Sequence, residues 1–80
     1  MKATVFVRPK AGILDPQGEA VQASLCALGF GVTGARVGRI VDLDLEATDP
    51  GAAHVEVERM CAELLANPLI ESVEIQIVSE

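Results

Sequence analysis

The amino-acid sequence predicts an α+β fold: a small ferredoxin-like two-layer sandwich, β-α-β-(β)-α-β, with two helices on one face of the sheet. Segments in which apolar residues alternate stand near both ends and in the middle of the chain, and two segments of helical periodicity separate them. Each helical segment begins with Asp-Pro, which suggests two related halves. A chain of 80 residues is long enough for one domain, which we expect over residues 1–80.

The first strand is predicted over residues 2–8, KATVFVR. Ala3, Val5 and Val7 would lie on one face, and this period of two in a run rich in β-branched residues is typical of a strand. Pro9 ends the strand because a proline has no N–H to donate to the sheet. We expect the face that carries Val5 and Val7 to contribute to the core.

The first helix is predicted to follow Asp15, a favourable N-cap, with Pro16 at the first helical position. Gly29 is placed to adopt the left-handed conformation that ends many helices, and Phe30 would then pack back on Leu25. The apolar stripe of this helix consists of Val21, Leu25 and Leu28.

The middle segment, VTGARVGRIVDLDLEA, is predicted to be extended. Gly34 and Gly38 interrupt it, and glycine inside a strand often marks a bulge or a bend. The segment forms either one bent strand or two short strands around Gly38, and we favour the bend. One face would carry the apolar residues Val37, Val41, Leu43 and Leu45, with Arg39 as the exception.

The second helix is predicted to begin at Asp49-Pro50, and Asn67-Pro68 ends it because the residue before a proline disfavours the α conformation. The last strand, ESVEIQIVS, alternates again. The predicted core stripe of the second helix is Ala53, Val57, Met60, Cys61, Leu64 and Leu65.

Composition excludes several function classes. The formal net charge is −6, which disfavours nucleic acid and anionic membranes as partners. The sequence contains no membrane-spanning run and no signal peptide, so we expect a cytoplasmic protein. Half of the residues (50%) are hydrophobic, which is more than a small two-layer domain can bury. We therefore expect an exposed apolar patch and a homodimer or tetramer.

Residues 29–34 read GFGVTG, which has the G-x-G-x-x-G spacing of dinucleotide-binding loops. Such loops follow a strand and open a helix whose N-terminus faces the phosphates. Here the glycines follow a predicted helix and precede an extended segment, so the nearer helix end is negative. We interpret them as helix-ending and turn residues and predict no cofactor.

The remaining reactive residues have structural interpretations. His54 is the only histidine and is expected on the surface in the first turn of the second helix. Cys26 and Cys61 lie on the apolar stripes of their helices and are expected to pack in the core, because buried thiols behave as small hydrophobic groups. We find no combination of nucleophile, base and orienting group, and therefore predict no catalytic residue and no metal site.

Two charged groups have alternative interpretations. Asp42, Asp44 and Glu46 project from one face of the extended segment and could bind a divalent cation, although a solvated strand face is favoured. Arg36 and Arg39 flank Gly38 and could bind a phosphate or a partner's carboxylate, or pair within the chain.

Several segments together resemble the PurS subunits of phosphoribosylformylglycinamidine synthase, an enzyme of purine biosynthesis. They are VRPKAGILDPQGEAV, LGF, RVGRIVDLDL and MCAELLANPLIESVEI, in that order, and they cover nearly the whole chain. The patterns K-x-x-[IV]-L-D-P-Q-G and L-L-A-N-P-[LIV]-I-E are specific as a pair. Arg39 stands where an R-x-G-K version has lysine.

The resemblance implies a non-catalytic, homo-oligomeric subunit that brings together a large ATP-dependent synthetase subunit and a glutaminase subunit and supports ammonia transfer between them. The alternative is a small ligand-sensing regulatory domain that binds an effector at a dimer interface. Asp15 and Asn67 could also be caps alone. The residues expected at partner contacts are Lys10, Asp15, Gln17, Arg36, Arg39, Asn67 and Pro68.

Overall fold

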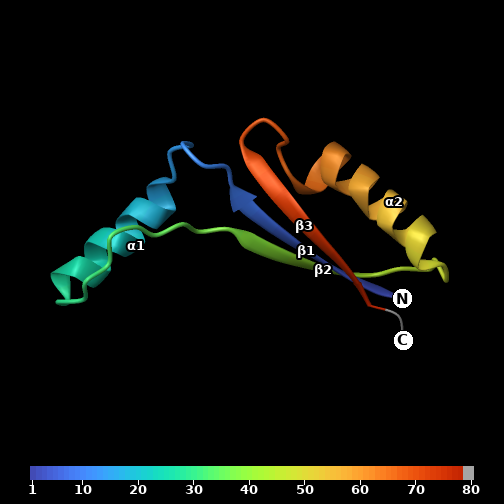
Figure 1. Ribbon diagram of the computed structural model, residues 1–80, viewed down its shortest axis with the longest axis horizontal. Helices are drawn as coiled ribbons and strands as arrows, with labels where there is room; N and C mark the ends of the chain where they lie inside the picture. Colours follow the sequence, from blue (N-terminus) through green and yellow to red (C-terminus); the bar gives the residue numbers. More distant parts are fainter. Residues whose placement is uncertain (79–80) are drawn as a thin grey trace.

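The computed structural model describes residues 1–78 and confirms the α+β class. Three strands form an antiparallel sheet in the order β2-β1-β3, so the first strand is central (Figure 1). Val5 of the central strand is paired with Val41 on one side and Ile75 on the other. The elements are β1 (Lys2–Pro9), α1 (Pro16–Ala27), β2 (Arg39–Asp44), α2 (Pro50–Met60), the π-helical turn η1 (Cys61–Leu65) and β3 (Glu71–Val78).

The core lies between one face of the sheet and α2. Val5 and Val7 of β1 and Val57 of α2 are fully buried, because the alternating face of the strand meets the apolar stripe of the helix. Aliphatic residues of β2 and β3 flank this cluster and are half-buried. The predicted core positions that are buried are Ala3, Val5, Val7, Ala53, Val57 and Cys61.

The first helix, α1, lies beyond the end of the sheet, whereas α2 covers one sheet face (Figure 1). The molecule is therefore elongated, with extents of 49 × 27 × 14 Å. We call residues 13–37, which comprise α1 and the extended segment beside it, the arm. The prediction that both helices lie on one face of the sheet holds for α2 but not for α1. An apolar stripe indicates that a helix face will be covered, but it does not identify what covers it.

The arm is held together along its length. Asp15 caps α1 by accepting the Gly18 N–H at 3.0 Å, and its second oxygen accepts the Val37 N–H at 2.8 Å. A Cβ on Gly18 would stand 2.3 Å from the carbonyl oxygen of Ala35, so only glycine allows this close approach. Gly29 ends α1 with a φ of 96°, as its position in the sequence predicts.

The middle segment enters the sheet only after Gly38. A Cβ at this position would lie 2.2 Å from the carbonyl oxygen of Val7, so glycine lets the chain pass close to β1 as it leaves the arm. Residues 30–38 are extended but form no strand, and among residues 1–78 the optional fourth strand is absent.

The second helical segment ends just before Asn67-Pro68, as predicted, but its last turn is wider than an α-helical turn. The Ala66 N–H donates to the Cys61 carbonyl at 3.1 Å, which closes the wider turn η1. This turn changes the helical spacing, so Leu64 is 84% exposed while Leu65 is half-buried. The prediction that Leu64 belongs to the core is therefore wrong.

The two cysteines differ in environment. Cys61 is buried, as predicted, and burial raises the pKa of its thiol. Cys26 is exposed on the arm, where its Sγ lies 3.2 Å from the carbonyl oxygen of Val32. The prediction that Cys26 packs in the core is wrong because the stripe of α1 has no sheet beneath it in this chain.

Candidate interaction site where the arm joins the sheet

The structure brings the predicted contact residues together where the arm meets the sheet. Asp15, Gln17 and Arg39 line one open groove of about 260 Å³ between the loop before α1 and the start of β2. Lys10 and Arg36 are linked to the same loops by hydrogen bonds, and the Asn67-Pro68 turn lies against Lys10. We call this region the junction.

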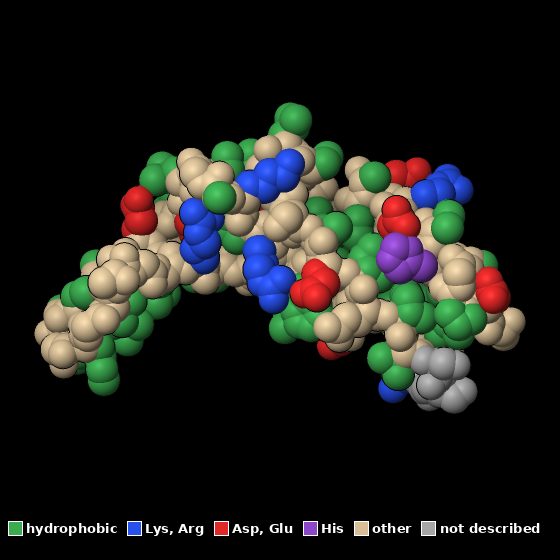
Figure 2. Space-filling view, viewed as in Figure 1, with side chains coloured by type: hydrophobic (Ala, Val, Ile, Leu, Met, Phe, Trp, Pro, Cys, Tyr) green, Lys and Arg blue, Asp and Glu red, His purple; other side chains and the backbone are tan. Residues whose placement is uncertain are grey.

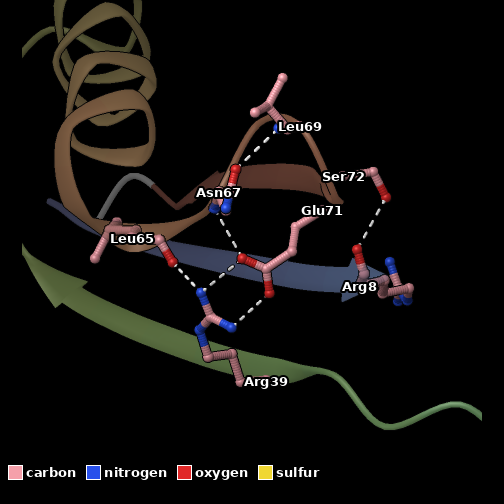
Figure 3. Close-up of polar contacts among 7 residues, drawn as sticks. All are labelled: Arg8, Arg39, Leu65, Asn67, Leu69, Glu71 and Ser72. Carbon is pink, nitrogen blue, oxygen red and sulfur yellow. Dashed lines mark hydrogen bonds and ion pairs between the residues drawn. The ribbon is translucent and has the colours of Figure 1, made fainter. Parts of the chain in front are cut away.

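An ion pair crosses the sheet at the junction (Figure 3). The Arg39 Nη1 lies 2.7 Å from the Glu71 Oε2, and Arg39 Nη2 lies 3.2 Å from Oε1 and also donates to the Leu65 carbonyl. The hydrogen bond from Arg39 holds the pKa of Glu71 below its usual value, and the same bond raises the pKa of Arg39. Arg39 therefore has an internal partner of opposite charge.

The turn between η1 and β3 is built around Asn67. Its Oδ1 accepts the Leu69 N–H at 3.1 Å, and its backbone N–H donates to the Glu71 Oε1 at 2.8 Å (Figure 3). The turn is thus fixed by side-chain to backbone bonds of the kind that asparagine makes readily. Glu71 was missed as a site residue, although an arginine on the core face of a strand is a signal that a carboxylate lies nearby.

Lys10 attaches the loop after β1 to this turn. Its Nζ donates to the Pro68 carbonyl at 2.7 Å, and its backbone N–H donates to the Ile70 carbonyl at 2.9 Å. Arg36 is attached in a similar way, because its Nη1 donates to the carbonyl of Lys10 at 3.0 Å. Carbonyl acceptors position these cations without neutralising them.

Asp15 and Gln17 lie at the start of α1. The N–H groups of Val37 and Gly18 hold the pKa of Asp15 below its usual value. Both of its oxygens are thus occupied by the arm, so Asp15 has a structural role whatever else it contacts. Gln17 is exposed.

The other candidate groups have local partners or stand apart. His54 is on the surface, as predicted, and its Nδ1 lies 2.7 Å from the Glu58 carboxylate one helical turn away. Asp42 accepts the Thr4 hydroxyl at 2.9 Å. Within the described part of the chain, no group of three or more His, Cys, Asp or Glu residues is arranged to hold a metal ion.

The structure therefore defines a class of protein: a small, elongated α+β module whose ordered polar residues shape loops and whose arm presents apolar side chains to solvent. Residues 2–79 match the PurS family, described as phosphoribosylformylglycinamidine (FGAM) synthase. The chain belongs to the PurS family, whose members are subunits of this synthase.

Individual relatives agree with this assignment. The chain is 42% identical over 69 residues to the PurS subunit of Synechocystis sp., covering 85% of this chain and 69% of that protein. It is 39% identical over 77 residues to the Methanocaldococcus jannaschii subunit, covering 95% and 93%. The resemblance seen in the sequence is thus confirmed.

Solved structures share the same arrangement. The crystal structure of Methanocaldococcus jannaschii PurS superimposes with a TM-score of 0.87 at 38% identity, covering 99% of this chain and 96% of that chain. A chain in the structure of PurLQS from Thermotoga maritima gives a TM-score of 0.85 at 31% identity, covering 96% and 95%. These matches support the synthase-subunit interpretation and give no support to the ligand-sensing regulatory domain.

Proposed function

We propose that this chain, acting as one domain over residues 1–80, bridges the large ATP-dependent synthetase subunit and the glutaminase subunit of FGAM synthase. The observation that carries the proposal is its match, over 96% of its length, to a chain of the PurLQS structure. The family assignment identifies the reaction, and the fold forms a rigid body with separate surfaces. Such a body can act by holding other proteins in position and needs no catalytic group of its own.

Self-association is part of the proposal. The arm exposes Leu14 (72%), Leu28 (74%) and Phe30 (59%), although these are among the largest apolar side chains in the molecule. Side chains of this size are stabilised by roughly 1.5–3 kcal/mol each when they are fully buried. A second copy that covered the arm would complete the layer that one chain leaves open, as a homodimer or as half of a tetramer.

Bridging also has a chemical purpose. Ammonia released from glutamine is mostly protonated at neutral pH and would be diluted in bulk water. A subunit that holds the glutaminase and synthetase sites in register raises the effective concentration of the intermediate. We propose that the chain supports ammonia transfer in this way.

The junction is our candidate for the surface that meets these partners. Its loops are fixed by internal hydrogen bonds, so they present a defined shape rather than a flexible one. We propose that the predicted contact residues act there, some directly and others, such as Asp15 and Asn67, by shaping the loops.

Assembly of purified subunits tests the proposal. Sedimentation of the chain alone at micromolar concentration should show a dimer or tetramer, and gel filtration with the two larger subunits should give one complex that contains all three. A stable monomer that enters no complex would contradict both parts. Leu28→Asp should weaken self-association, whereas Leu64→Asp, on a different exposed surface, is a matched control.

We propose a cytoplasmic location, because purine biosynthesis uses soluble metabolites. Among the described residues, no helix has the length and apolar character needed to cross a bilayer.

A further inference from the structure

The basic residues of this acidic protein are unevenly distributed. The chain carries a net charge of −6 and only six Lys and Arg residues, four of which lie at or beside the junction. Figure 2 shows basic side chains gathered over the middle of the molecule, between the arm and the sheet. The four basic residues at or beside the junction are Arg8, Lys10, Arg36 and Arg39.

Arg36 and Lys10 are ordered but not neutralised. Arg36 donates to the carbonyls of Pro9 and Lys10, and Lys10 donates to the carbonyl of Pro68. Among residues 1–78, no carboxylate lies within ion-pair distance of either cation. The carboxylate of Asp15 is near enough for Arg36 to affect its pKa, but its oxygens already accept backbone N–H groups.

Arg8 is held loosely at the same end of the sheet. Its Nη1 lies 3.4 Å from the Glu74 carboxylate, with both side chains more than half exposed, and such pairs contribute little to stability. The guanidinium also lies 5.4 Å from the centre of the Phe6 ring. Arg8 can therefore exchange Glu74 for another carboxylate at small cost.

A groove of about 610 Å³ is lined by the cations of Arg8, Arg36 and Arg39. We call it the basic groove; its walls combine charge with apolar surface, and Ile40 is 61% exposed beside it. The lining of the basic groove includes Phe6, Arg8, Arg36, Gly38, Arg39 and Ile40.

This combination fits a protein segment better than a free phosphate. Phosphate sites usually offer backbone N–H groups at a helix N-terminus. The nearby N-terminus of α1 is already capped by the carboxylate of Asp15, which would repel an anion. An acidic segment that also carries an apolar side chain can use both the cations and the exposed surface of Ile40.

We propose that the basic groove binds an acidic segment of a partner subunit, with Arg36 and Arg8 meeting its carboxylates. The inference rests on the proposed function, because the partner is a subunit of the same complex. Complementary charge of this kind accelerates association and fixes the orientation of the partner. It would leave the apolar arm free for self-association.

The test measures the affinity of this chain for an equimolar mixture of the two purified larger subunits. Arg36→Glu and Arg8→Glu should each raise the Kd roughly tenfold or more, and the salt dependence of binding should become shallower. Arg36→Lys should retain most of the affinity. Arg59→Glu is the matched control, because Arg59 is also exposed to solvent but lies on α2, paired with Glu63. Circular dichroism checks that every variant is folded.

Each outcome decides the proposal. If Arg36→Glu and Arg8→Glu bind like the unmodified chain, the basic groove is not the docking surface, although bridging itself stands. If the unmodified chain fails to bind the mixture, the proposed function fails instead. Competition by millimolar inorganic phosphate at constant ionic strength would identify a phosphate site and overturn the proposal. So would loss of self-association in Arg36→Glu, because the occupant would then be a second copy.

Discussion

Arg39 on β2 and Glu71 at the start of β3 form a two-point ion pair across the central strand, with the closest atoms 2.7 Å apart. The pair therefore links the two outer strands of the sheet at the end where the arm begins. Because Arg39 also donates to the Leu65 carbonyl, the same contact fixes the end of the second helix. The side chain of Arg39 thus connects β2, β3 and η1 at the junction.

Glu71→Gln should destabilise the fold at neutral pH and should matter less in acid. The folded protein holds the pKa of Glu71 below its ordinary value of 4.5, so the carboxylate stabilises the fold fully above that value. This contribution is lost as the pH falls through the lower pKa of the folded state. Urea midpoints measured from about pH 6 down to about pH 3 should therefore converge for the variant and the unmodified chain. A constant difference across this range would contradict the ion pair.

Gly38→Ala should destabilise the protein by roughly 1–3 kcal/mol, because the new Cβ would collide with backbone rather than with a movable side chain. The clash would be with the Val7 carbonyl, at 2.2 Å. Gly34→Ala is the matched control: nothing lies within 4 Å of its Cβ position, so its effect should stay within about 1 kcal/mol. Urea unfolding at one fixed protein concentration measures both, and equal effects would show that the close approach at Gly38 is incorrect.

Val57→Ala should cost about 2 kcal/mol, because it removes two buried carbons and leaves a cavity beneath α2. Val57 is 0% exposed, whereas Val55 on the same helix is 59% exposed. Val55→Ala should change the free energy of unfolding by no more than about 0.5 kcal/mol. Thermal unfolding of the two variants tests the orientation of α2, and a larger effect at Val55 would mean that the helix is rotated.

The two thiols should differ in their reaction rates with a water-soluble thiol reagent. Cys26 is exposed, whereas Cys61 is buried and its thiol pKa is raised, so Cys26 should react first in the folded protein. Variants with Cys26→Ser or Cys61→Ser assign the two phases. In denaturant the rates should become similar. A fast phase that persists in Cys26→Ser would show that Cys61 is accessible.

The starts of both helices and the end of the first strand could be predicted because a few neighbouring residues determine each of them. Asp15 and Asp49 cap the helices, and Pro9 ends the first strand, each for reasons contained in a few neighbouring residues. The spacing of apolar residues in the sequence also predicted most of the buried stripe of α2. It failed at Leu64, because the wider turn η1, which the bond from the Ala66 N–H to the Cys61 carbonyl helps to close, leaves no signature in the sequence.

The placement of α1 could not be predicted from the chain by itself. Its apolar residues have the spacing of a covered face, yet Leu28 and Cys26 are exposed. Similarly, Arg39 was recognised as an exception on a core face, but its partner Glu71 is distant in sequence and is brought close only by the pairing of β1 with both outer strands. Contacts between distant segments, and between molecules, are the information that local patterns lack.

Bridging without catalysis is tested most directly by comparing glutamine-dependent and ammonia-dependent FGAM synthase activity with and without this chain. We predict that omitting it abolishes most of the glutamine-dependent rate, lowers the ammonia-dependent rate less, and that adding it back restores both. Unchanged rates in its absence would contradict the proposed role, as would turnover of any synthase substrate by this chain alone.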